Sequence, residues 1–165
     1  MQTHTVVESP IGDLTLVNTD GVLSGLWMGH RARGWTRADL GEGGRSGFEQ
    51  AVEELGEYFA GERRKFTVPT AARGNAFQQR VWGRLRQIPF GQTRSYGKVA
   101  RELGDPGLAR AVGSANARNP VGIVVPCHRV IGSDGSLTGY AGGLERKRFL
   151  LHLEASVSER ASTLF

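Results

Sequence analysis

The chain has 165 residues, 39% of them hydrophobic and 22% charged, which is the composition of a folded globular protein and excludes a disordered or fibrous one. Its longest stretches without a charged side chain, such as residues 21–30, reach ten residues, whereas a membrane-spanning helix needs roughly 18 or more apolar residues. Acidic residues near the N-terminus, Glu8, Asp13 and Asp20, interrupt the apolar run that a secretory signal requires, so we expect a cytoplasmic protein without membrane contact.

Charge is divided unevenly along the chain. Residues 1–72 hold seven Lys or Arg against ten Asp or Glu, a net −3, while residues 73–165 hold fourteen against six, a net +8. A basic segment of this kind favours a polyanionic partner, because lysines and arginines that neutralise phosphates release condensed counterions. A solvated basic face without a partner is the alternative, and charge alone does not separate the two.

The first third of the chain predicts an antiparallel β-meander. Short β-rich runs at 2–8, 14–17 and 22–28 are separated by turn residues. Residues 29–47, rich in glycine and arginine, predict a long loop. Apolar residues then recur at helical spacing and predict a helix packed on the sheet, with the apolar face Phe48, Val52, Leu55 and Phe59. The segment 62–74 is the expected linker between domains of residues 1–72 and 73–165.

The second half of the chain predicts helices. Asn75 can cap a helix that ends at Pro89, and Ser95 can cap a helix over 96–103. A glycine-containing turn separates that helix from another short one at 108–117. Two short helices joined in this way within a basic region suggest a helix-turn-helix.

The remaining segments complete this C-terminal domain. The apolar, β-branched run 121–125 predicts a buried strand, and the glycine-rich residues 131–143 predict a loop. A helical pattern returns at 144–153, and we expect the tail after Glu154 to be frayed. The predicted fold class is α/β: an N-terminal antiparallel β-meander with a helix, followed by a helical C-terminal domain with a helix-turn-helix.

Cys127 is the single cysteine and therefore either packs in the core or acts as a reactive thiol. An apolar run that stops at Pro126, and a histidine at position 128, favour the reactive thiol. Successive residues of a strand face opposite sides, so Cys127 and His128 can cooperate only if the chain turns after Pro126 or if a water relays the proton. We expect a water to relay the proton from Cys127 to His128.

A histidine base needs an acceptor on its second ring nitrogen, and Glu154 is the candidate, with a surface carboxylate as the alternative. The other histidines, His4, His30 and His152, form no metal-ligand spacing. We expect no metal and no other cofactor.

The residues around Cys127 resemble a known family, the O6-alkylguanine-DNA alkyltransferases, also called methylated-DNA–protein-cysteine methyltransferases. The matching stretches are Asn119-Pro120, Pro126-Cys127-His128-Arg129-Val130, Gly139-Tyr140 and Gly142-Gly143-Leu144. The resemblance extends with consistent spacing from Phe77-Gln78-Gln79 through Ser95-Tyr96 and 109–113 to Glu154. It implies a ribonuclease H-like N-terminal domain.

The resemblance implies that Cys127 takes the alkyl group from O6 of a damaged guanine in one irreversible turnover. His128 would accept the thiol proton through a water, and Glu154 would orient His128. Tyr96 would donate to the guanine ring, as an oxyanion-type donor does. Asn119 would tie the recognition helix to the active-site turn.

The same resemblance assigns the guanine pocket to Tyr140, Val130, Ala141 and Lys147. The carbonyls of Cys127 and Val130 would accept from the exocyclic amine. Many relatives carry serine where this chain has Ala141, which puts the range of bulky alkyl groups in doubt. A solvated helix charge is the alternative for Lys147. Asn116 stands where some relatives carry an apolar residue, and a polar groove contact is the alternative for it.

The implied partner is double-stranded DNA containing O6-alkylguanine, from which the target base must flip out. Arg110 matches the family's arginine that fills the vacated stack. The other residues expected at the DNA are Ala109, Ala111, Gly113, Ser114, Arg118 and Ser95. Core packing is the alternative for the small ones, and we expect a monomer.

Two other functions stay open. A cysteine hydrolase could use Cys127, His128 and Glu154, although the Cys and His of such enzymes are normally remote in sequence. A damage sensor or regulator could bind DNA without catalysis, although binding alone needs no nucleophile.

Overall fold

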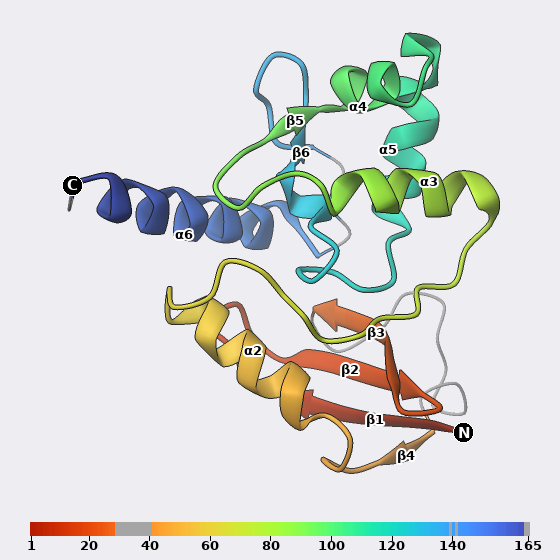
Figure 1. The fold of residues 1–165 in the computed structure, drawn as a ribbon, viewed down its shortest axis with the longest axis vertical. Coiled ribbons are helices and arrows are strands. Elements are labelled where there is room, and N and C mark those ends of the chain that lie inside the picture. Colours follow the sequence, from red (N-terminus) through yellow and green to blue (C-terminus); the bar gives the residue numbers. More distant parts are fainter. Residues whose placement is uncertain (29–40, 139, 141, 164–165) are drawn as a thin grey trace. The chain divides into compact units, whose positions relative to one another are not determined.

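The computed structural model describes residues 1–28, 41–138, 140 and 142–163. They belong to two compact units, one of residues 1–73 with 120–124 and one of residues 74–119 with 125–165 (Figure 1). Residues 29–40 of the expected loop lie outside the described residues, as do Gly139 and Ala141. Among the described helices, none is long and apolar enough to cross a bilayer.

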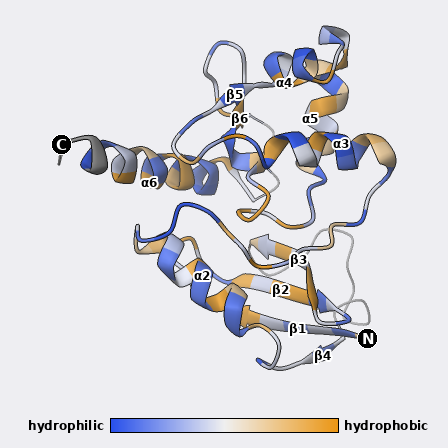
Figure 2. Cartoon of the chain, viewed as in Figure 1, coloured by the Kyte–Doolittle hydropathy of each residue, from blue (hydrophilic) through white to orange (hydrophobic). Residues whose placement is uncertain are grey.

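The first unit contains the predicted antiparallel meander, made of β1 (Gln2–Val7), β2 (Leu14–Thr19) and β3 (Val22–Met28). A two-residue strand that the sequence did not reveal, β4 (Glu42–Gly43), pairs in parallel with β1 and gives the order β3-β2-β1-β4. Apolar residues line β2 and β3, as Figure 2 shows, and all but the last residue of β2 are buried. The three-strand prediction is confirmed.

The helix α2 (Glu49–Phe59) also lies where the spacing predicted a helix, but it buries a different face. Its buried residues are Ala51, Glu54, Leu55 and Tyr58, while Val52 is 40% exposed. The predicted face was therefore wrong at Val52. The spacing of hydrophobic residues does not predict a buried face that includes Glu54. This carboxylate can be buried because the segment 67–68 supplies hydrogen-bond donors to it.

The second unit contains the predicted helices and one small parallel sheet. Its elements are α3 (Ala76–Leu85), β5 (Arg94–Ser95), α4 (Tyr96–Glu102), η1 (Pro106–Leu108), α5 (Ala109–Ala117), η2 (Cys127–Arg129), β6 (Val130–Ile131) and α6 (Leu144–Thr163). Asn75 and Gln78 form a capping box at α3, and the Ser95 Oγ accepts from the Lys98 backbone N–H at 3.0 Å. Both predicted N-caps are confirmed.

The helix capped by Asn75 ends at Leu85 and not at Pro89, and two further segments expected in the second half of the chain were wrong. The segment 121–125 is not a strand: Val121 makes an isolated bridge to Leu26 and the chain then turns, with a φ of 68° at Ile123. Short apolar runs are buried equally well in a turn, so hydrophobicity alone could not tell the two apart. The tail after Glu154 is not frayed, because α6 continues to Thr163 and buries Val157.

Candidate active site

The active-site turn begins where the chain leaves Val125. Residues 127–129 form a 3-10 turn, in which the Arg129 N–H donates to the Pro126 carbonyl at 3.1 Å. The chain therefore turns after Pro126. Neighbouring residues face opposite sides only in a strand, so this restriction does not apply to Cys127 and His128. The turn is followed by β6, which pairs in parallel with β5 and so lies next to the start of α4.

The thiol of Cys127 is almost completely buried, with 6% of the residue exposed. Burial raises the pKa of Cys127, and hydrogen bonds from Asn119 and Tyr140 and the positive charge of Lys147 act in the opposite direction. The net effect favours the protonated thiol, so reaction at this sulfur needs a base that removes the proton.

His128 and Glu154 form a buried pair. The His128 Nε2 and the Glu154 Oε2 are 2.6 Å apart, and the two side chains are 0% and 1% exposed. Burial lowers the pKa of His128 even though the hydrogen bond to Glu154 raises it. A neutral imidazole that donates Nε2–H to the carboxylate leaves Nδ1 as an acceptor. Nδ1 is buried and has no hydrogen-bond partner among the described residues.

Glu154 is therefore not the surface carboxylate that the sequence left as an alternative. Burial opposes its ionisation, but hydrogen bonds and charges from His128 and Arg129 outweigh that effect and hold the pKa of Glu154 far below its usual range. Sequence reasoning predicted no contact between Arg129 and Glu154. In the structure, Arg129 is buried and donates to both oxygens of Glu154.

Two asparagines connect the end of α5 to the active-site turn. The Asn119 Nδ2 donates to the Val125 carbonyl at 2.8 Å, which is the contact expected between the recognition helix and the turn. The Asn116 Nδ2 donates to the Cys127 carbonyl at 3.2 Å. Asn116 is 2% exposed, so the alternative of a polar groove contact was wrong.

Lys147 is buried and lies between two tyrosines. Its Nζ donates to the carbonyls of Val130 at 2.6 Å and Thr138 at 2.9 Å. It also lies 5.9 Å from each of the ring centroids of Tyr96 and Tyr140. The alternative of a solvated helix charge was wrong, and burial lowers the pKa of Lys147 to about 8.

The groups expected to contact guanine are engaged by other protein groups in this structure. The Val130 carbonyl accepts from Lys147, and the Cys127 carbonyl accepts from Asn116 and from the Val130 N–H. The Tyr96 hydroxyl donates to the Thr138 carbonyl at 3.0 Å, and burial raises the pKa of Tyr96. A tyrosine with a raised pKa keeps its proton and remains a hydrogen-bond donor.

The helix-turn-helix is formed by α4 and α5, and α3 supports it. The Trp82 Nε1–H donates to the Ala115 carbonyl at 2.8 Å, and the Arg80 guanidinium donates to the Leu103 carbonyl at 3.0 Å. These contacts fix the C-terminal end of each of the two short helices on α3.

The residues expected at the DNA divide into three groups. Arg110, Ala111, Ser114 and Arg118 are exposed and Ala109 is half-buried. Gly113 is half-buried beneath Tyr96, where an added Cβ would lie 3.8 Å from the ring. Ser95 is the N-cap of α4.

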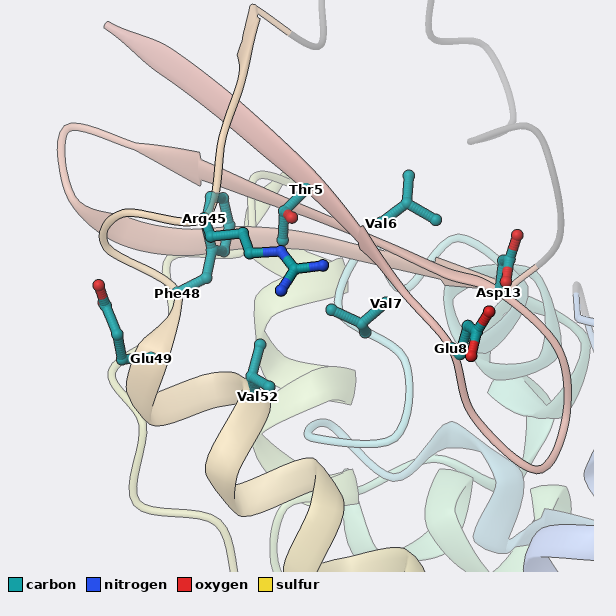
Figure 3. Close-up of a pocket in the computed structure, with 9 residues that line it drawn as sticks. All are labelled: Thr5, Val6, Val7, Glu8, Asp13, Arg45, Phe48, Glu49 and Val52. Atoms are coloured by element: carbon teal, nitrogen blue, oxygen red, sulfur yellow. The ribbon is translucent and has the colours of Figure 1, made fainter.

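The first unit has a separate groove of about 610 Å³ between β1 and the start of α2 (Figure 3). Figure 3 shows Val7 and Val52 pointing toward one another across it, with the guanidinium of Arg45 above them. The other side chains that line it are Thr5, Val6, Glu8, Asp13, Phe48 and Glu49. This lining contains no thiol or imidazole, so the groove offers no cysteine–histidine pair. Within the described residues, no cluster of three His, Cys, Asp or Glu side chains could hold a metal ion.

Comparison with known families gives two matches that together span most of the chain. Residues 3–72 match the ribonuclease-like domain of 6-O-methylguanine DNA methyltransferase, and residues 76–156 match the DNA binding domain of the same protein. The chain belongs to the 6-O-methylguanine DNA methyltransferase family.

Individual relatives agree with this assignment. The methylated-DNA–protein-cysteine methyltransferase of Mycolicibacterium paratuberculosis is 52% identical over 98% of each chain, and the constitutive one of Bacillus subtilis is 41% identical over 93% of this chain and 96% of that one. The crystal structure of Mycobacterium tuberculosis O6-methylguanine methyltransferase has 50% identity and a TM-score of 0.88, with 94% of each chain covered. Mycobacterium tuberculosis OGT in complex with DNA has 50% identity and a TM-score of 0.85 over the same share of each chain.

Proposed function

We propose that this chain repairs DNA by direct reversal, taking the alkyl group of O6-alkylguanine onto Cys127. The observation that carries the proposal is a buried thiol whose neighbour, His128, is held neutral against Glu154 with Nδ1 left as an acceptor. Family membership supplies the substrate, because the relatives are named methylated-DNA–protein-cysteine methyltransferases.

The proposed reaction is a displacement at the alkyl carbon. His128 takes the thiol proton, through a bridging water, and the Cys127 sulfur attacks the carbon attached to O6. The bond between O6 and the alkyl carbon breaks, and its electron pair stays with the guanine, which takes up one proton. The thiol and the alkylguanine thus become a thioether and guanine. A thioether has no good leaving group for regeneration, so each chain acts once.

Other residues would bind the purine and stabilise its charge. We assign Tyr96 as the donor to the departing guanine and Tyr140, Val130, Ala141 and Lys147 as the lining of its pocket. Asn119 would hold the thiol in place through its contacts with Cys127 and the Val125 carbonyl. In this proposal, the Tyr96 hydroxyl exchanges Thr138 for the substrate.

DNA binding would use the exposed face of α5. The proposal draws support from the exposure of Arg110 and Arg118, from the net +8 charge of residues 73–165, and from a relative solved in complex with DNA. Arg110 would fill the space that the flipped base leaves in the stack. We further propose a cytoplasmic location, because the partner is duplex DNA and a reactive thiol is kept reduced there.

The test is an intact-mass measurement after incubation with duplex DNA that contains O6-methylguanine. We expect one methyl group per chain, mapped to Cys127, and no increase in mass for Cys127→Ser, which should still bind the duplex. DNA binding without any change in mass would indicate a damage sensor instead. Repeated turnover of a thioester or peptide without a lasting adduct would indicate a hydrolase.

A further inference from the structure

The Glu154 carboxylate accepts hydrogen bonds from His128, Arg129 and Gly91. His128 donates through Nε2 to Oε2 at 2.6 Å, Arg129 donates through Nε to Oε1 at 2.8 Å and through its terminal nitrogen to Oε2 at 3.0 Å, and the Gly91 N–H donates to Oε1 at 3.2 Å. The two N–H groups of Arg129 reach both carboxylate oxygens, which is the bidentate geometry that fixes a carboxylate in one plane.

The guanidinium of Arg129 is itself held in place on its other side. Its second terminal nitrogen donates to the Ile88 carbonyl at 2.7 Å, and the guanidinium carbon lies 5.7 Å from the centroid of the Phe90 ring. Arg129 is 7% exposed. A buried arginine with such contacts is rigid, so it can impose an orientation on Glu154 rather than follow it.

The charges around His128 determine what this contact does to the base. Glu154 on α6 favours the imidazolium, whereas Arg129 in the same turn and Lys147 on α6 disfavour it, and burial disfavours it most. The turn after α3 contributes backbone groups, the Ile88 carbonyl and the Gly91 N–H. Without Arg129, the full negative charge of Glu154 would act on His128, which would then hold a proton on both nitrogens more readily.

We propose that Arg129 is a positioning residue for alkyl transfer: it orients the Glu154 carboxylate toward His128 Nε2 and offsets its charge, so that His128 stays neutral with Nδ1 able to accept the Cys127 proton. This inference rests on the proposed function of Cys127. Arg129 does not touch the sulfur in this role and acts through Glu154.

The experiment compares the pH dependence of single-turnover methyl transfer to Cys127 in wild type, Arg129→Gln and Arg129→Lys. Removing the charge should move the acidic limb of the rate profile upward by about one pH unit, because His128 becomes protonated at higher pH. Arg129→Lys should keep the limb near its wild-type position, because the charge remains, and should lower the plateau rate, because a lysine cannot bind both oxygens in one plane.

Arg148→Gln is the matched control, since Arg148 is exposed and lies on the same helix as Glu154. It should leave the limb unchanged when DNA is saturating. An Arg129→Gln protein that is folded by circular dichroism and keeps the wild-type limb would overturn the proposal, because a merely structural ion pair alters stability without moving the profile. A wild-type chain that gains no methyl group would instead refute the proposed function.

A direct measurement covers the case in which Arg129→Gln does not fold. Nitrogen-15 NMR of the histidine rings in wild type and Arg129→Lys should show His128 as the neutral Nε2–H tautomer at neutral pH. An imidazolium at His128 under those conditions in the wild type would overturn the proposal.

Discussion

At the scale of single residues, the protonation of His128 is a balance between opposing charges. Glu154 raises the pKa of His128, while burial and the charges of Arg129 and Lys147 lower it. His128 is therefore a weak base, and it follows in the same turn a thiol whose own pKa is raised by burial. In the proposed reaction, we expect such a pair to transfer the proton as the sulfur attacks and not to store a thiolate beforehand.

This balance predicts the effect of Glu154→Gln. Methyl transfer should slow by about 10²-fold or more, because the amide no longer stabilises the imidazolium that forms as Cys127 loses its proton. The acidic limb of the profile should move to lower pH, opposite to the shift expected for Arg129→Gln, because the pKa of His128 falls. Single-turnover rates against pH test this, with the exposed Glu159→Gln as the control. A limb that moved upward would contradict this account of His128.

At the scale of elements, one buried carboxylate attaches α2 to the segment that follows it. Glu54 is 3% exposed and accepts from the Thr67 Oγ1 at 2.6 Å and from the backbone N–H groups of Thr67 at 2.9 Å and Val68 at 3.0 Å. Burial opposes its ionisation, but these donors and the Gln50 side chain lower the pKa of Glu54 from 4.5 to about 2. The ionised form is therefore the one that holds the segment 67–68.

The predicted consequence is a pH-dependent contribution to stability. The folded-state pKa lies below the ordinary value, so the stabilisation is complete above pH 4.5 and is lost as the pH falls toward 2. Glu54→Gln should reduce the free energy of unfolding by about 1–3 kcal/mol at about pH 7, and by much less at about pH 3. Urea denaturation measures both values, and exposed Glu53→Gln should differ little from wild type at either pH. An equal loss at both would show that the charge of Glu54 is irrelevant.

At the scale of the whole molecule, charge is segregated between the two halves of the chain, with net −3 in residues 1–72 and net +8 in residues 73–165. Exposed cations on and next to α5, Arg110 and Arg118, belong to the basic half. Affinity for duplex DNA should therefore depend on phosphate contacts of this half.

Salt dependence tests this assignment. The logarithm of the binding constant for undamaged duplex should fall linearly with the logarithm of salt concentration, by about 0.9 for each phosphate contact. Arg118→Ala should reduce that slope by about one, as the loss of one contact does. Lys65→Ala, which removes an exposed cation from the acidic half, should leave the slope unchanged in anisotropy titrations. Equal effects of the two substitutions would mean that binding follows net charge and not the surface of α5.

Local sequence signals predicted most of the elements. Asn75 and Ser95 cap helices as their side chains and positions indicate, and the meander follows from β-rich runs separated by turns. These features depend on neighbours within a few residues, which a sequence displays directly. The predictions of a strand at 121–125 and of the buried face of α2 were wrong. Burial there depends on partners distant in the chain, Leu26 for Val121 and Thr67 for Glu54.

The sequence by itself determined the nucleophile, since the chain has one cysteine and that cysteine lies in a recognisable motif. It suggested Glu154, 26 residues further along the chain, as the partner of His128, but it could not decide whether Glu154 is buried beside His128 or lies on the surface. Tertiary structure decided that α6 returns to η2, burying Glu154 and Lys147 and bringing Arg129 against both carboxylate oxygens. The reason is physical: the protonation of buried groups depends on desolvation and on charges within a few ångströms, and only the folded chain sets those distances.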